Sequence, residues 1–189
     1  MLAFVMSGDG GWASADRALA DALVRHGIPV VGLDSRSYLK QPHTPDQAAA
    51  DLARTLTHYM ASWSRERLVL IGYSRGADIL PFLVNRLPPA LRGAIAGVAL
   101  IGLADHASFE FHWADLVRDV RRPTDLPTRP EVDALRGLTV VCSYGEHERG
   151  SLCPALDPSL ARPLVHGGDH RLPAKDAAMV IDALLSDGR

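Results

Sequence analysis

The sequence predicts an α/β protein, a three-layer sandwich in which a mostly parallel, six-stranded sheet carries helices on both faces. Short apolar segments of strand length alternate along the chain with amphipathic segments of helix length. The apolar segments are apolar at nearly every position, which is typical of parallel strands buried on both sides. The 189 residues, of which 47% are hydrophobic and 22% charged, fit a single globular domain over residues 1–189.

Six segments are predicted to be strands: residues 2–6, 28–33, 67–72, 95–103, 138–143 and 162–166. Each is bounded by helix or turn signals, so that consecutive strands are joined by crossovers. Right-handed crossovers place the loops that follow the strands at one edge of the sheet, where ligands of such folds bind.

Four helices are predicted between these strands. They cover residues 14–26, 44–62, a segment that follows Ser74 and stops before Pro88, and residues 173–185. Gly27 is a typical C-terminal cap of the first helix. Thr44 and Gln47 form the pattern of a capping box, with Pro45 at the first helical position of the second.

The segment 103–136 is longer than the usual connection and carries aromatic residues in alternation at Phe109, Phe111 and Trp113. Two interpretations stay open, because long segments of this kind are usually functional or irregular. One is a lid over the site; the other is an excursion that contains a short edge strand.

Charge and hydropathy exclude some classes of protein. The chain has 20 basic and 22 acidic residues, a formal charge of −2, and its longest basic run is Arg121-Arg122. We therefore expect no nucleic-acid partner. No apolar run reaches the roughly 18 residues of a membrane span. No signal peptide is recognisable, which taken literally predicts a cytoplasmic protein.

The loop after the first predicted strand is rich in glycine. Gly8, Gly10 and Ala13 satisfy the G-x-G-x-x-G/A pattern, and Asp34 ends the next predicted strand. A dinucleotide-binding turn has this pattern in this context, with the acid on the ribose. Binding of a dinucleotide is therefore one functional hypothesis.

A second motif, Gly72-Tyr73-Ser74-Arg75-Gly76, stands between a predicted strand and a predicted helix. This is the context of a nucleophile elbow, in which a strained turn projects the serine hydroxyl above the sheet. The flanking glycines are needed because a Cβ there would collide with a neighbouring element. The main-chain N–H of Arg75 would then point at a developing oxyanion.

A nucleophilic serine needs a base and an acid that orients it, and the chain order in this fold is Ser, Asp/Glu, His. Ser74, Glu148 and His170 have this order, and each follows a predicted strand. Glu146 is the competing candidate for the acid. No helical spacing typical of a metal site accompanies these residues, so we expect neither a metal nor a cofactor.

These three positions favour an ester hydrolase with a Ser-Glu-His triad over a dinucleotide-binding protein. In a hydrolase the first loop would supply the second oxyanion N–H, from Asp9 or Gly10, and its glycines would let the backbone approach the substrate. Asp34 would then cap its loop or form a polar wall of the pocket.

Several motifs resemble one family. They are SGDGGW from Ser7, GYSRGAD from Gly72, the segment from Tyr144 to Pro154, and GGDH ending at His170. Together they resemble the bacterial virulence protein VirJ and the related AcvB domain, across nearly the whole chain. The resemblance implies an α/β-hydrolase-like fold, export to the periplasm, and an aminoacyl-phosphatidylglycerol such as lysyl-phosphatidylglycerol as substrate.

The resemblance also implies a disulfide between Cys142 and Cys153, because the periplasm is oxidising. We expect a lipid or other ester substrate, a peripheral contact with a membrane, and contacts with secretion-system proteins. A non-enzymatic partner-binding protein that retains the elbow is the alternative class. Four residues are expected to line the substrate site: Trp12, Asp34, Tyr38 and Glu146.

Overall fold

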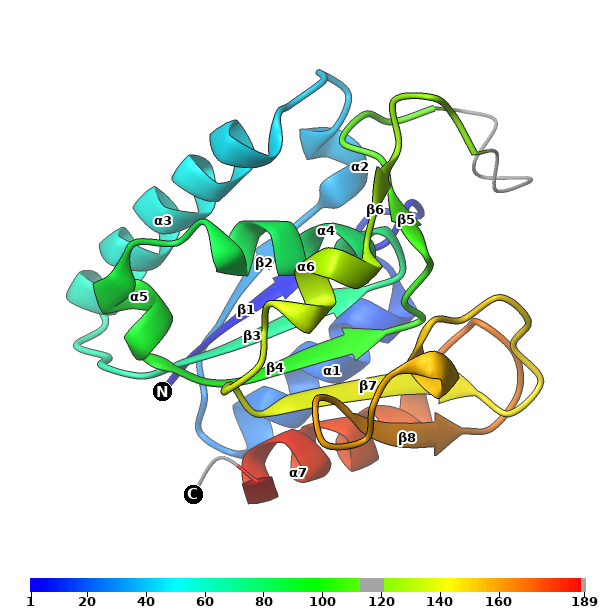
Figure 1. The fold of residues 1–189 in the computed structure, drawn as a ribbon. Helices are drawn as coiled ribbons and strands as arrows, with labels where there is room; N and C mark the ends of the chain where they lie inside the picture. Colours follow the sequence, from blue (N-terminus) through cyan, green and yellow to red (C-terminus); the bar gives the residue numbers. More distant parts are fainter. Residues whose placement is uncertain (113–120, 188–189) are drawn as a thin grey trace.

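A computed structural model describes residues 1–112 and 121–187, and strands and helices alternate along it (Figure 1). The strands are β1 Leu2–Met6, β2 Val30–Leu33, β3 Leu68–Tyr73, β4 Ile95–Ile101, β5 His106–Ala107, β6 Leu126–Pro127, β7 Val140–Gly145 and β8 Arg162–His166. The helices are α1 Ser14–Arg25, α2 Ser35–Tyr38, α3 Pro45–Ser62, α4 Arg75–Asn85, α5 Pro89–Gly93, α6 Arg129–Asp133 and α7 Ala177–Asp187. Two 3-10 turns, η2 Cys153–Ala155 and η3 Ala174–Asp176, complete the described elements.

The main sheet has six strands in the order β2-β1-β3-β4-β7-β8, and every neighbouring pair is parallel. This confirms the predicted architecture. From β1 the chain first goes to β2 on one side and then to β3 on the other, so the order reverses between β1 and β3. Ligands bind at such a switch point, beyond the carboxyl ends of the strands.

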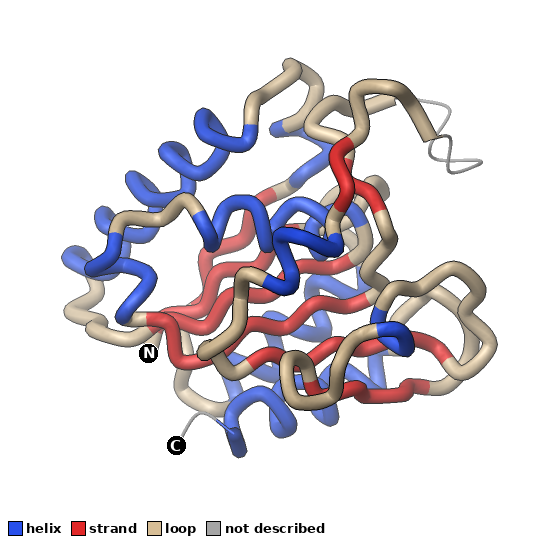
Figure 2. Tube along the Cα trace, viewed as in Figure 1, coloured by secondary structure: helices blue, strands red, loops and turns tan. Residues whose placement is uncertain are grey.

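Helices cover both faces of this sheet (Figure 2). Leu2, Phe4 and Met6 of β1 belong to the core beneath α3 and α4, whereas Ala3 and Val5 belong to the core beneath α1 and α7. Successive side chains of a strand point to opposite faces. Since both faces are buried, the strand is apolar at every position.

The predicted helix signals are confirmed. The Thr44 hydroxyl accepts from the Gln47 N–H at 3.2 Å, and the Gln47 side chain accepts from the Thr44 N–H at 2.9 Å. Gly27 has φ +71°, as a glycine cap requires. The fourth strand is shorter than the predicted range 95–103. It ends at Ile101, because Gly102 turns the chain with φ +66°.

The described part of the segment 103–136 leaves the sheet. β5 and β6 pair with each other in an antiparallel ladder, with His106 opposite Pro127, and α6 follows. In its described residues, the excursion forms a small hairpin of its own and adds no edge strand to the main sheet (Figure 1). No helix in residues 1–112 or 121–187 is long and apolar enough to cross a membrane.

Phe109 does not fit the lid hypothesis. It is 8% exposed and packs edge-to-face on Phe82 of α4, with 5.4 Å between ring centroids. This aromatic residue therefore belongs to the core, because α4 offers it an apolar partner. Phe111 packs against the same core below the guanidinium of Arg36, and Trp113 lies outside the described residues.

Candidate active site

Ser74 lies at a strained turn between β3 and α4. Its φ of 52° and ψ of −122° are rarely adopted by a residue with a Cβ. A Cβ built on Gly72 would lie 2.4 Å from the carbonyl oxygen of Gly76, and one on Gly76 would lie 2.2 Å from that of Met6. The elbow geometry and its need for both glycines are thus as the sequence predicts.

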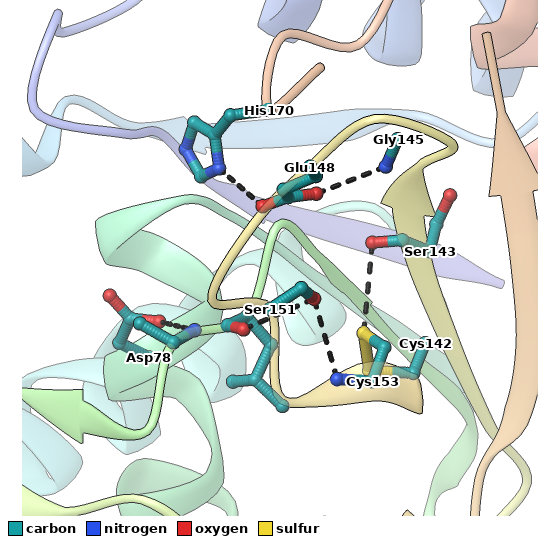
Figure 3. Close-up of a disulfide and its surroundings, with 10 residues drawn as sticks. Asp78, Cys142, Ser143, Gly145, Glu148, Ser151, Cys153 and His170 are labelled. Atoms are coloured by element: carbon teal, nitrogen blue, oxygen red, sulfur yellow. Dashed lines mark hydrogen bonds and ion pairs between the residues drawn. A yellow bond between two sulfur atoms is a disulfide. The ribbon is translucent and has the colours of Figure 1, made fainter. Parts of the chain in front are cut away.

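The structure brings Ser74, His170 and Glu148 into one hydrogen-bonded chain. The hydroxyl of Ser74 lies 2.8 Å from Nε2 of His170, and Nδ1 of His170 lies 2.6 Å from Oε1 of Glu148. Oε2 of Glu148 accepts from the N–H of Gly145 at 3.0 Å (Figure 3). With a neutral imidazole, Nδ1–H donates to the carboxylate and Nε2 accepts from the serine.

Glu146, the competing acid, lies elsewhere on the same loop. Its Oε1 is 3.5 Å from the main-chain nitrogen of Gly168 and 3.5 Å from Nε2 of His147. Of the two glutamates, Glu148 is the one in contact with His170.

The environments of the three groups differ. The Glu148 side chain is 5% exposed, whereas that of His170 is 46% exposed. The hydrogen bond that His170 donates to the Glu148 carboxylate raises the pKa of His170. Burial alone would raise the pKa of Glu148, but hydrogen bonds from His170 and Gly145 outweigh it and lower that pKa. The carboxylate is therefore ionised at neutral pH and favours a charged imidazole.

Two glycines that the sequence analysis did not single out make room for the histidine. A Cβ on Gly102 would lie 2.7 Å from Cε1 of His170. One on Gly145 would lie 2.0 Å from the carbonyl oxygen of Asp169. The ends of β4 and β7 thus allow the His170 loop to pass closely. The glycines at the ends of these two strands indicate turns in the sequence. The sequence does not show that the His170 loop passes over them.

The first loop, residues 7–11, packs directly on the elbow. A Cβ on Gly8 would lie 2.9 Å from Cβ of Ser74. On the other side, the hydroxyl of Ser35 donates to the carbonyls of Ser7 and Gly8 at 2.7 and 2.8 Å. The close approach that Gly8 permits is therefore to Ser74, which favours the hydrolase hypothesis over the dinucleotide one for this turn.

The side chains of Asp9 and Arg75 are paired. Nε and Nη2 of Arg75 donate to the two carboxylate oxygens of Asp9 at 2.9 and 3.2 Å. Gly10 lies in the same turn, and a Cβ there would meet no atom of the described residues within 4 Å. The three residues expected to donate main-chain N–H groups thus lie in two segments next to Ser74.

The four residues expected to bind substrate make contacts of different kinds. Asp34 caps α2 by accepting from Ser37 N–H at 3.0 Å, and its carboxylate lies against Gly11. The ring of Trp12 packs on β2, where a Cβ on Gly32 would lie 2.5 Å from it.

The hydroxyl of Tyr38 donates to Asp51 of α3 at 2.7 Å, and its ring stacks on His43 at 4.2 Å. Burial, reinforced by Asp51, raises the pKa of this phenol. These contacts give Trp12 and Tyr38 packing roles, whereas Asp34 and Glu146 present carboxylates near the first and acid loops. A contact of any of the four with substrate stays a prediction.

The loop that carries Glu148 is covalently anchored. Cys142 of β7 and Cys153 are joined by a disulfide with 5.4 Å between Cα atoms, inside the ~4.4–6.8 Å range of such bonds. This confirms the expected bond. The N–H of Leu152 donates to the carbonyl of Leu103 at 2.8 Å, and the hydroxyl of Ser151 lies between Leu103 and the N–H of Cys153 (Figure 3).

Asp78 is a buried acid below the site. Its carboxylate accepts from the N–H of Ala104 at 2.7 Å and fastens α4 to the segment after β4 (Figure 3). Burial raises the pKa of Asp78 to about 7, although the Ala104 N–H and the charge of Arg75 oppose the shift. In the part of the chain that the structure describes, no three His, Cys, Asp or Glu side chains gather in a way that could hold a metal ion.

Known proteins resemble this chain in sequence and in fold. The family model described as bacterial virulence protein (VirJ) matches residues 1–188. A carboxylesterase, Culp1 of Mycobacterium tuberculosis, is 40% identical over 57 residues, which are 30% of this chain and 24% of that protein. The sn-1-specific diacylglycerol lipase ABHD11 of Danio rerio is 27% identical over 125 residues, 62% of this chain and 37% of that protein. The chain thus matches well under half the length of these relatives.

The fold is that of a known superfamily. A putative hydrolase of the α/β superfamily from Xanthomonas campestris superimposes with a TM-score of 0.63 over 98% of both chains, at 17% identity. This likeness concerns the fold alone, whereas the family match covers nearly every residue. The chain has the α/β-hydrolase fold and belongs to the VirJ family of bacterial virulence proteins.

Proposed function

We propose that the protein is a serine ester hydrolase in which Ser74 is the nucleophile, His170 the general base and Glu148 the acid that orients the base. The observation that carries the proposal is the continuous hydrogen-bonded chain through these residues, 2.8 Å and 2.6 Å long at its two links. Both distances lie within hydrogen-bond reach, as proton transfer between them requires.

The reaction follows from this geometry. Oγ of Ser74 attacks the ester carbonyl while its proton moves to Nε2 of His170, and the ionised Glu148 stabilises the imidazolium that forms. The main-chain N–H groups of Arg75 and of Asp9 or Gly10 hold the oxyanion of the tetrahedral intermediate. The protonated His170 then gives its proton to the leaving alcohol, and an acyl-enzyme remains.

Water completes the cycle by the same steps in reverse. His170 takes a proton from the attacking water, the second tetrahedral intermediate forms, and Ser74 leaves with the proton that His170 returns. The half-exposed His170 is consistent with this step, because solvent reaches the imidazole directly.

We propose an aminoacyl-phosphatidylglycerol, such as lysyl-phosphatidylglycerol, as the substrate. Membership of the VirJ family supports it, and so do the carboxylates of Asp34 and Glu146, which could bind a cationic aminoacyl group. The carboxylate of Asp9 is not counted among these, because it is paired with Arg75. Phe109 does not support an apolar lid over the lipid part of the substrate, because its side chain belongs to the core.

We further propose a periplasmic location with a peripheral contact at the membrane where this lipid resides. The Cys142–Cys153 disulfide supports an oxidising compartment. We also propose contacts with secretion-system proteins, and membership of the VirJ family is their support.

Lysine release tests the substrate. Purified protein is incubated with vesicles that contain lysyl-phosphatidylglycerol, and free lysine is measured against the Ser74→Ala variant. We expect release by the wild type only, and Asp34→Asn should raise KM for the lysyl ester more than for a p-nitrophenyl ester. A wild type that hydrolyses the p-nitrophenyl ester but releases no lysine would refute the substrate and leave the esterase. A folded wild type without either activity would instead favour a partner-binding protein.

A further inference from the structure

The ion pair between Asp9 and Arg75 joins two parts of the site that are 66 residues apart in the sequence. It is bidentate, with donor–acceptor distances of 2.9 and 3.2 Å. The side chain of Arg75 is 6% exposed and that of Asp9 22%, so solvent screens the pair little. A planar guanidinium that meets a carboxylate in this way fixes direction as well as distance.

In the proposed reaction, Arg75 supplies one main-chain N–H group to the oxyanion, and Asp9 or its neighbour Gly10 supplies the other. Asp9 lies in the turn after β1, and Arg75 is the first residue of α4. The ends of β1 and β3 are neighbours in the sheet, with Met6 opposite Gly72. Below the pair, the lack of a Cβ on Gly76 lets α4 touch the end of β1.

The rest of the first loop is held from the opposite side. The hydroxyl of Ser35 binds the carbonyls of Ser7 and Gly8, and the N–H of Gly11 donates to Gly8 at 3.0 Å. These contacts shape the loop but do not connect its tip to α4. The Asp9 side chain makes that connection, through Arg75.

We propose that the Asp9–Arg75 ion pair is a positioning device that holds the two amide-bearing segments at the separation an oxyanion requires. This rests on the proposed function and deepens it. Donors must lie about 2.7–3.1 Å from the oxyanion oxygen, so their mutual placement decides how well the transition state is bound. A misplacement of about 1 Å can cost roughly 10²-fold in rate.

The pair also suits this task electrostatically. Its charges cancel next to a site where negative charge develops, so the main-chain dipoles face the oxyanion without a carboxylate opposing them. Asp78 lies near enough to Arg75 for the guanidinium to oppose the increase in its pKa that burial causes. Two N–H groups of the guanidinium meet the carboxylate of Asp9, so Asp9 helps to set the orientation of the Arg75 side chain.

The test compares Asp9→Asn and Arg75→Lys with a matched control. Asparagine keeps the shape of Asp9 but loses the charge and the second acceptor, and lysine keeps the charge but loses the fork. The control is Glu131→Gln, which breaks a partly buried pair with Arg86, 2.8 Å long, between α6 and the end of α4. For each variant, kcat and KM for p-nitrophenyl butyrate, the inhibition constant of phenylboronic acid and the thermal midpoint are measured.

We expect both site variants to lower kcat by about 10- to 100-fold with KM within about threefold, because the donors act mainly in the transition state. The inhibition constant of the boronic acid, which forms a tetrahedral adduct with the serine, should rise by a similar factor. Glu131→Gln should change the thermal midpoint but neither kinetic quantity.

A wild-type kcat and boronate affinity in either folded site variant would overturn the inference alone, and so would loss of the fold in both. A wild type that neither cleaves the ester nor binds the boronic acid would overturn the proposed function, and this inference with it. The two failures are therefore distinguishable.

Discussion

Replacement of Cys142 and Cys153 by alanine would remove the covalent link between β7 and the loop that carries Glu148. The cross-link spans 11 residues of sequence. In the chain-entropy model a loop of this length contributes about 3 kcal/mol to the free energy of unfolding. Both cysteines are buried, at 0% and 2% exposed, so the alanines leave no polar group without a partner.

This loss translates into a measurable shift. For a domain of this size each kcal/mol changes the thermal midpoint by about 2–4 °C, so the variant should melt about 6–12 °C lower. The effect on kcat should be smaller than that of losing Glu148 itself, about 3- to 10-fold. The loop keeps its hydrogen bonds from Leu152 to Leu103 and from Glu148 to Gly145, which still hold the acid near His170.

Thermal melts followed by circular dichroism measure the shift, on wild type and variant, each with and without a reductant. Reductant should lower the midpoint of the wild type towards that of the variant and leave the variant unchanged. If the double alanine variant melts with the oxidised wild type, the bond does not stabilise the fold. If it melts lower but keeps the full kcat, the bond does not position Glu148.

Two further variants test the elbow and the histidine. Gly76→Ala should destabilise the fold by about 3 kcal/mol or more in urea unfolding, because its Cβ would lie 2.2 Å from the main-chain oxygen of Met6. The control Gly93→Ala, whose Cβ would meet no atom of the described residues within 4 Å, should not destabilise it. Equal stabilities of the two variants would contradict this. His170 must be neutral to act as a base, so activity is lost as pH falls through its raised pKa. Glu148→Gln should therefore move the acid limb of the kcat/KM profile to lower pH, and an unmoved limb would show that Glu148 does not set that pKa.

The elements that the sequence predicts well are those with a local signal. The strand at residues 2–6 is apolar throughout, and Thr44 and Gln47 define a cap through neighbours three residues apart. The elbow follows from local chemistry too, since both flanking glycines and Ser74 lie within five residues. Each of these features has a signal within a few residues of sequence, even where the contact behind it is distant, as it is between Gly76 and Met6.

Features that depend on distant partners could not be read in this way. Phe109 looked like part of a lid because nothing nearby in the sequence indicates that Phe82 packs against it. The choice between Glu146 and Glu148 depends on the path of the His170 loop, which Gly145 admits. The pairing of Asp9 with Arg75 depends on the first loop and the start of α4, which meet only in the folded protein.

Ser74 is the proposed nucleophile, and His170 is the proposed base that activates it. Reaction with a fluorophosphonate, followed by mass spectrometry of the peptides, tests this most directly. We expect one phosphonylated residue, Ser74, in the wild type, no labelling of Ser74→Ala, and labelling of His170→Ala that is slower by about 10³-fold. Labelling that survives Ser74→Ala, or that proceeds at the wild-type rate in His170→Ala, would contradict the account.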